Sequence, residues 1–265
     1  MFIFIEYVQN KTNIIYPNTN EGMRITPKVI GGLVKNNKYL HMKIFLSLCT
    51  VLLLLAGCKN ETKKTAVSET SVSNEESITT KIADANGFAN FKKVNQLNFT
   101  FNVKVNDTVR SQRSWKWYPK ENKIELTEKG ETFSYIKKDT LGEQAKAADQ
   151  KFINDTYWLL FPYQLMWSDF NFEFNQMSTA PISQQQMQGL VVNYSDDGGY
   201  TPGDTYSLYL SDDLMVKEWT YESAGGRSLT TTWEDYETFK GITISKMRKS
   251  PDGSFQLYFT DIEVK

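Results

Sequence analysis

The side chain best placed for chemistry in this sequence is the thiol of Cys58. It follows an apolar run over residues 44–56, which Lys43 precedes and a stretch rich in Lys, Glu, Ser and Thr follows. A charged start, an apolar segment and then small residues is the order of a secretory signal. The apolar run is about 13 residues long, whereas a membrane-spanning helix needs roughly 20. The pattern therefore predicts a signal peptide over residues 42–57, and neither a transmembrane helix nor a buried core helix.

Residues 55–58, Leu-Ala-Gly-Cys, resemble the lipobox of bacterial lipoproteins, and residues 149–165 resemble a segment of lipoproteins of flavobacteria, within the Bacteroidota. The resemblance implies cleavage between Gly57 and Cys58, a diacylglycerol on the Cys58 thiol, and a membrane partner reached through these acyl chains. Lys59 implies sorting to the outer membrane, with the periplasmic and the surface face both open. Because signal peptides start with a short charged region, we expect Met42 to be the start and residues 1–41 to be an upstream extension.

The composition after residue 57 excludes several classes of enzyme and metal site. The only histidine is His41, and Cys58 is the only cysteine in residues 58–265. A chain without histidine and without a free thiol cannot build a Ser-His-Asp or Cys-His site, or a zinc site of His and Cys ligands. Its 24 Lys and Arg residues against 29 Asp and Glu form no basic stripe, so nucleic acid is not an expected partner. We expect a protein that is not an enzyme and has no metal or cofactor.

The elements that follow are mostly strands. Residues 58–87 are polar and predict a flexible tether, which leaves one domain over residues 88–265. Apolar and polar residues alternate over residues 99–105, and Asn106-Asp107 follows as a tight turn. The same alternation predicts further strands around Trp115, Ile124, Tyr135, Leu190, Leu208, Trp219, Thr231, Ile244 and Leu257, with a bulge near Thr260.

One helix interrupts this series of strands. Residues 143–161 contain good helix formers and no Gly or Pro, and the helix is predicted to end at Pro162. Its last turn is apolar nearly all round, so it must be enclosed or face an apolar ligand. The predicted fold class is mainly β (α+β), a strongly curved antiparallel sheet that forms an unclosed half-barrel with an inserted central helix. The candidate cavity or lid residues are Phe152, Tyr157, Trp158, Leu159, Leu160 and Phe161.

This order of elements, with Tyr-Trp-Leu-Leu-Phe-Pro-Tyr at residues 157–163, resembles the lipoprotein-carrier fold of the LolA, LolB and LppX families over residues 88–265. The resemblance implies an apolar cavity that binds a lipid or the acyl chain of a lipoprotein. It also implies an arginine on the sheet that holds the helix closed, a role that no motif assigns to Arg110 or Arg113. Each buried methylene contributes about 0.8 kcal/mol, so such a cavity needs no catalytic group.

The same residues allow an alternative in which the half-barrel holds no cavity. The interior aromatic side chains could simply fill the half-barrel, as they do in small barrels. The protein would then be a binding module for a glycan or a protein partner, with sugar-stacking side chains among Tyr200, Tyr206, Tyr209, Trp219 and Tyr221. Acidic pairs such as Asp212-Asp213 lie at predicted turns, which explains them without a glycosidase site. Residues 195–204 lack the spacing of an EF-hand calcium loop.

Overall fold

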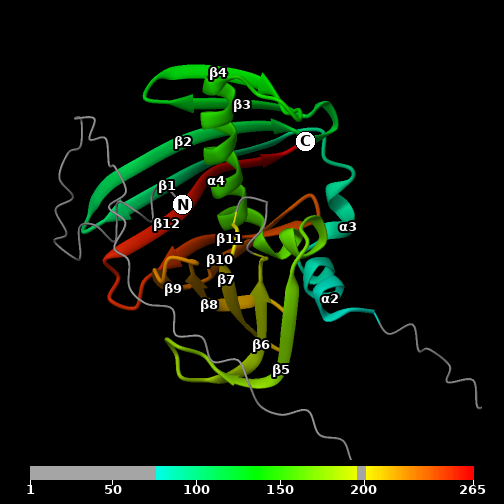
Figure 1. The fold of residues 1–265 in the computed structure, drawn as a ribbon, viewed down its shortest axis with the longest axis vertical. Helices are drawn as coiled ribbons and strands as arrows, with labels where there is room; N and C mark the ends of the chain where they lie inside the picture. The colour runs from blue at the N-terminus through cyan, green and yellow to red at the C-terminus, as the bar shows by residue number, and fades with distance from the viewer. Residues whose placement is uncertain (1–75, 196–200) are drawn as a thin grey trace, which may run out of the picture. The chain divides into compact units, whose positions relative to one another are not determined.

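A computed structural model of the chain describes residues 76–195 and 201–265 (Figure 1). Gly57 and Cys58, the predicted signal peptide, the upstream extension and most of the predicted tether lie outside the described residues. So does Tyr200. Within the described ranges, no helix is both long enough and apolar enough to span a membrane.

A seven-stranded antiparallel sheet contains the strands from both ends of the described chain. Its order is β10-β11-β12-β1-β2-β3-β4. The turn between β1 and β2 has Asn106 and Asp107 in the left-handed region, with φ of 47° and 64°, as a two-residue hairpin turn requires. The strands are β1 (Leu97–Val105), β2 (Thr108–Tyr118), β3 (Lys123–Glu128), β4 (Glu131–Ile136), β10 (Glu234–Phe239), β11 (Ile242–Lys249) and β12 (Phe255–Val264).

A second antiparallel sheet has five strands in sequence order. It consists of β5 (Asn171–Thr179), β6 (Gln186–Asn193), β7 (Thr205–Leu210), β8 (Val216–Glu222) and β9 (Ser228–Thr232). The chain passes from this sheet to β10 of the seven-stranded sheet through Trp233. The sequence did not predict β5 and β10. Each lies at the edge of its sheet. β5 is exposed over most of its length, and in β10 the only apolar residues, Tyr236 and Phe239, have opposite strand parity.

The helix that links the two sheets is α4 (Glu143–Trp167), which crosses in front of the strands in Figure 1. Phe152 packs against Trp115 of β2, and Phe161 packs against Trp219 of β8, so α4 contacts both sheets. The predicted fold class, an unclosed antiparallel half-barrel with a central helix, is confirmed. The predicted end of the helix is wrong, because α4 continues through Pro162 with a kink at Leu160, where φ is −128° and ψ is 36°.

The folded domain begins before the predicted residue 88. Helix α2 (Ile78–Ala85) buries Ile82 and Ala83, and the short helix α3 (Phe88–Phe91) follows it. The backbone oxygen of Asn86, between them, accepts hydrogen bonds from the Tyr163 hydroxyl at 2.8 Å and the Thr243 amide at 2.9 Å. The end of the predicted tether is therefore part of the domain. Its few apolar residues recur on one helical face, which the polar composition of the segment obscures.

Candidate functional site around the central helix

The structure brings the predicted cavity and lid residues together inside the half-barrel. The buried ones are Phe152, Tyr157, Leu159, Leu160 and Phe161, while Trp158 is half-buried. Their rings pack against aromatic residues of the five-stranded sheet. The centroids of Phe161 and Tyr206 lie 4.8 Å apart, and so do those of Trp158 and Trp219. In this conformation the interior around these residues is packed with side chains.

A buried ion pair ties the first part of α4 to the seven-stranded sheet. Arg113 on β2 donates from Nη2 to Asp155 Oδ1 at 2.6 Å and from Nε to Asp155 Oδ2 at 2.8 Å. The indole Nε1 of Trp115 also donates to Oδ2, at 2.8 Å. Burial alone would lower the pKa of the Arg113 guanidinium, but the charge and hydrogen bonds of Asp155 raise it above its ordinary value. Arg113 therefore meets the helix, whereas Arg110 is exposed.

A second contact between sheet and helix lies at the kink. Because Pro162 has no N–H, the carbonyl of Trp158, four residues earlier, lacks its helical partner. Arg248 on β11 donates from Nη2 to this carbonyl oxygen at 2.6 Å. Its Nη1 donates to the backbone oxygen of Ser245 at 2.8 Å and to the Ser245 hydroxyl at 2.9 Å. Arg248 thus replaces the hydrogen bond that Pro162 removes, and α4 can continue.

The charged guanidinium of Arg248 is buried among aromatic side chains. Its side chain is fully buried, and its guanidinium carbon lies 3.7 Å from the ring centroid of Trp233 and 5.5 Å from that of Phe259. No carboxylate of the described residues forms an ion pair with it, and burial lowers the pKa of the guanidinium to about 9. The sequence analysis missed Arg248. Its position offered a signal, because it shares the strand parity of the inward-facing Ile242 and Ile244.

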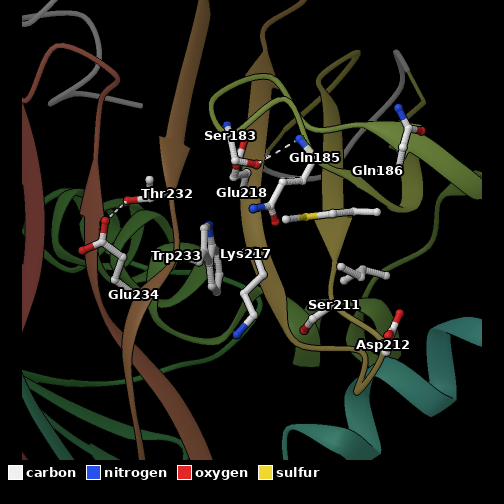
Figure 2. A pocket seen from close by; sticks show the side chains of 12 residues that line it. Ser183, Gln185, Gln186, Ser211, Asp212, Lys217, Glu218, Thr232, Trp233 and Glu234 are labelled. Carbon is white, nitrogen blue, oxygen red and sulfur yellow. Dashed lines mark hydrogen bonds between the residues drawn. The ribbon is translucent and has the colours of Figure 1, made fainter.

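An open groove of about 490 Å³ lies beside Trp233, where the chain leaves the five-stranded sheet (Figure 2). The carboxylate of Glu218 accepts hydrogen bonds from the backbone amides of Ile182 at 2.6 Å and Ser183 at 2.9 Å, which holds the connection between β5 and β6 over the groove. The side chains of Lys217 and Glu234 also line it. This groove was not predicted, because its lining comes from four separate segments of the chain.

The residues that indicated other functions have structural roles here. Tyr206, Trp219 and Tyr221 are buried, so they cannot form the sugar-stacking surface that was predicted as the alternative. Asp204 is also buried and accepts hydrogen bonds from the Tyr221 hydroxyl at 2.9 Å and the Ala224 amide at 3.2 Å. In the part of the chain that the structure describes, no group of acidic, histidine or cysteine residues could hold a metal ion.

Comparisons with known proteins give a distant likeness in fold. No protein-family model matches the chain, and no curated protein matches it. The similar solved structures include the following two. A LolA superfamily protein from Nitrosomonas europaea has a TM-score of 0.42 and 10% identity, with 72% of this chain and 94% of that chain covered. A DUF1329 family protein from Desulfovibrio piger has a TM-score of 0.39 and 8% identity, with 71% and 90% covered. Values this low carry no information about a ligand or an activity.

Proposed function

We propose that this protein is a non-catalytic envelope lipoprotein, anchored to the outer membrane through acyl chains on Cys58, that binds a lipid or lipoprotein acyl chain inside its half-barrel. The observation that carries the proposal is a kinked helix enclosed in an aromatic interior and held there by buried polar contacts from the sheet. An apolar interior of this kind supplies about 0.8 kcal/mol for each methylene of a bound chain.

Binding requires the first part of α4 to move, because side chains fill the interior in the closed conformation. The kink at Leu160 divides the helix into two parts. The part before it contacts the sheets through Asp155 and the Trp158 carbonyl, and the part after it contacts α2 and α3 through Tyr163. Release of these contacts, of the Tyr135–Asp149 hydrogen bond and of the Lys151–Glu128 ion pair would free the first part, with the second part staying in place.

The alternative is a module with a filled interior that binds a glycan or a protein partner. The polar groove beside Trp233 is the observation in its favour. Under this alternative, acyl chains would not reach the interior side chains of α4, and the two functions are separated by the next experiment.

We expect brominated fatty acids to quench the tryptophan fluorescence of the full-length protein, because bromine quenches an indole that it touches. Trp158 faces the interior, whereas Trp167 is 40% exposed at the end of α4. Trp158→Phe should reduce the quenched fraction, and the matched control Trp167→Phe should leave it unchanged. Native mass spectrometry of the detergent-extracted protein should also show bound lipid. Absence of both lipid and quenching would contradict the proposed function.

Lipid anchoring has its own test. Cys58→Ser removes the only thiol that residues 58–265 contain, so it should abolish palmitate labelling and release the protein from the membrane fraction. Fractionation and radiolabelled palmitate incorporation measure the two effects, and Cys49→Ser is the control within the predicted signal peptide. If the Cys58→Ser protein still sediments with membranes and still carries palmitate, the lipoprotein interpretation is wrong.

A further inference from the structure

We propose that Arg248, Trp219, Trp233 and Thr231 form a buried polar site that receives the carbonyl or carboxylate oxygen of an acyl ligand. This inference rests on the proposed function and specifies the ligand chemistry, an acyl chain that ends in a hydrogen-bond acceptor. The side chains come from β8, β9, β11 and the corner between the two sheets.

The first observation is a group of buried polar atoms without partners. They are Trp219 Nε1, Thr231 Oγ1, Trp233 Nε1 and Arg248 Nε. Buried polar atoms in folded proteins are nearly always hydrogen-bonded, so four exceptions in one place require an explanation. They do lie in one place. Trp219 and Thr231 are cross-strand partners, the ring centroids of Trp219 and Trp233 are 5.3 Å apart, and Arg248 stacks on Trp233.

The second observation is that all four atoms can donate a hydrogen bond. An indole N–H and the Nε–H of an arginine can only donate, and a threonine hydroxyl can do so. The missing partner is therefore an acceptor. Arg248 also brings a positive charge that no carboxylate of the described residues balances, and a buried charge without a partner is costly. An oxygen that carries full or partial negative charge satisfies both requirements.

The third observation is the apolar wall around the site. The ring centroid of Trp158 lies 4.8 Å from that of Trp219 and 6.4 Å from that of Phe255, and Phe259 packs on the Arg248 guanidinium. A sugar or a nucleotide would leave its other polar groups unpaired against these rings. A hydrocarbon chain with a single hydrogen-bond acceptor would contact these rings and leave no other polar group unpaired. A fatty-acid carboxylate and the ester carbonyl of a lipid share this chemistry.

The groove supplies a route to the site. Trp233 lines the groove and is only 3% exposed, so one of the four buried donors belongs to a residue that borders the groove. In Figure 2 its side chain stands at the centre of the lining residues, beside Lys217. Rotation of this side chain, together with movement of α4, would connect the groove to the site, and Lys217 would add a second cation at the entrance.

The test compares three ten-carbon probes on the full-length protein by isothermal titration calorimetry. Decanoate should bind at least about tenfold more tightly than decane, since a hydrogen bond to a charged group contributes about 1.5–3 kcal/mol. Methyl decanoate distinguishes the two ligand sources. Affinity equal to that of decanoate indicates an ester carbonyl, and weaker affinity indicates a free carboxylate.

The variant is the double substitution Trp219→Phe with Trp233→Phe, which keeps a six-membered aromatic ring at each position and removes both unpaired N–H groups. It should weaken decanoate binding about tenfold or more and lower the affinity for decane by less, and the smaller side chains should lower the Tm of the ligand-free protein through lost packing. Trp115→Phe is the matched control. Its N–H is bonded to Asp155, so its loss should lower the Tm, and because it acts on the opening of α4 it should shift decanoate and decane affinity together and leave their ratio unchanged.

Equal binding of decanoate and decane, or wild-type decanoate affinity in the double variant, would overturn this site while the proposed acyl binding stands. Failure of all three probes to bind the wild-type protein would overturn both the site and the proposed function.

Discussion

Asp155→Ala is expected to lower the free energy of unfolding by about 3–5 kcal/mol, because it removes the nearest partner of the buried Arg113 charge and leaves only Glu128, at 4.0 Å. The Asp155 carboxylate is fully buried and accepts two hydrogen bonds from Arg113, one from the Trp115 indole and one from the Asn154 amide, so four hydrogen bonds are lost at once. Urea unfolding followed by circular dichroism measures the change.

Two comparisons make this result specific. Glu237→Ala breaks an exposed ion pair with Lys246 and should change the free energy of unfolding by less than about 1 kcal/mol. The double variant Arg113→Met with Asp155→Leu removes both charges, so it should be more stable than Asp155→Ala alone. If the double variant were the less stable of the two, the unpaired charge would not be the cause of the loss.

Arg248→Met is expected to lower the free energy of unfolding by about 2–3 kcal/mol. The substitution removes a charge-assisted hydrogen bond and leaves the Trp158 carbonyl without a partner inside the fold. Relief of the buried charge offsets part of the loss. Lys246→Met, on the same strand but partly exposed, should change stability by less than about 1 kcal/mol.

A second substitution tests whether Arg248 stabilises the helix through the Trp158 carbonyl. Pro162→Ala restores an N–H four residues after Trp158, which should recover about 1 kcal/mol in the Arg248→Met protein. In the wild-type protein Arg248 already satisfies that carbonyl, so the gain there should be smaller. A double-mutant cycle by urea unfolding would then give a coupling energy of about 0.5 kcal/mol or more. Equal effects of Pro162→Ala in both backgrounds would contradict this account of the kink.

Several strands were predictable because their pattern is local. Apolar and polar residue types alternate over residues 99–105 of β1, although Thr100 and Asn102 are buried as well, and the turns at Asn106-Asp107 and around Gly253 carry the residues that such turns need. The bulge predicted near Thr260 is also confirmed, with Asp261 in the left-handed region at φ of 55°. The edge strand β5 escaped prediction because most of it is exposed, and β10 because its two apolar residues, Tyr236 and Phe239, do not share a strand parity.

The end of α4 could not be predicted from local sequence rules. Pro162 ends an isolated helix, and the sequence analysis placed the end there. In the folded protein α4 continues past Pro162 because Arg248 supplies the missing hydrogen bond to Trp158, from which it is 90 residues distant in the sequence. Similarly, Arg110 and Arg113 could not be told apart as helix contacts until the register of β2 pointed Arg113 inward.

By itself the sequence determined the alternating strands, the apolar last turn of the predicted helix, and the loss of histidine and thiol chemistry after Cys58, which stays a predicted lipidation site. Only the tertiary structure decided which arginines meet the helix and which buried donors lie together without acceptors. The physical reason is the distance along the sequence over which each kind of interaction acts. Periodicity and turn chemistry act between neighbours in the chain, whereas burial and hydrogen-bond partners are set by residues that only folding brings together.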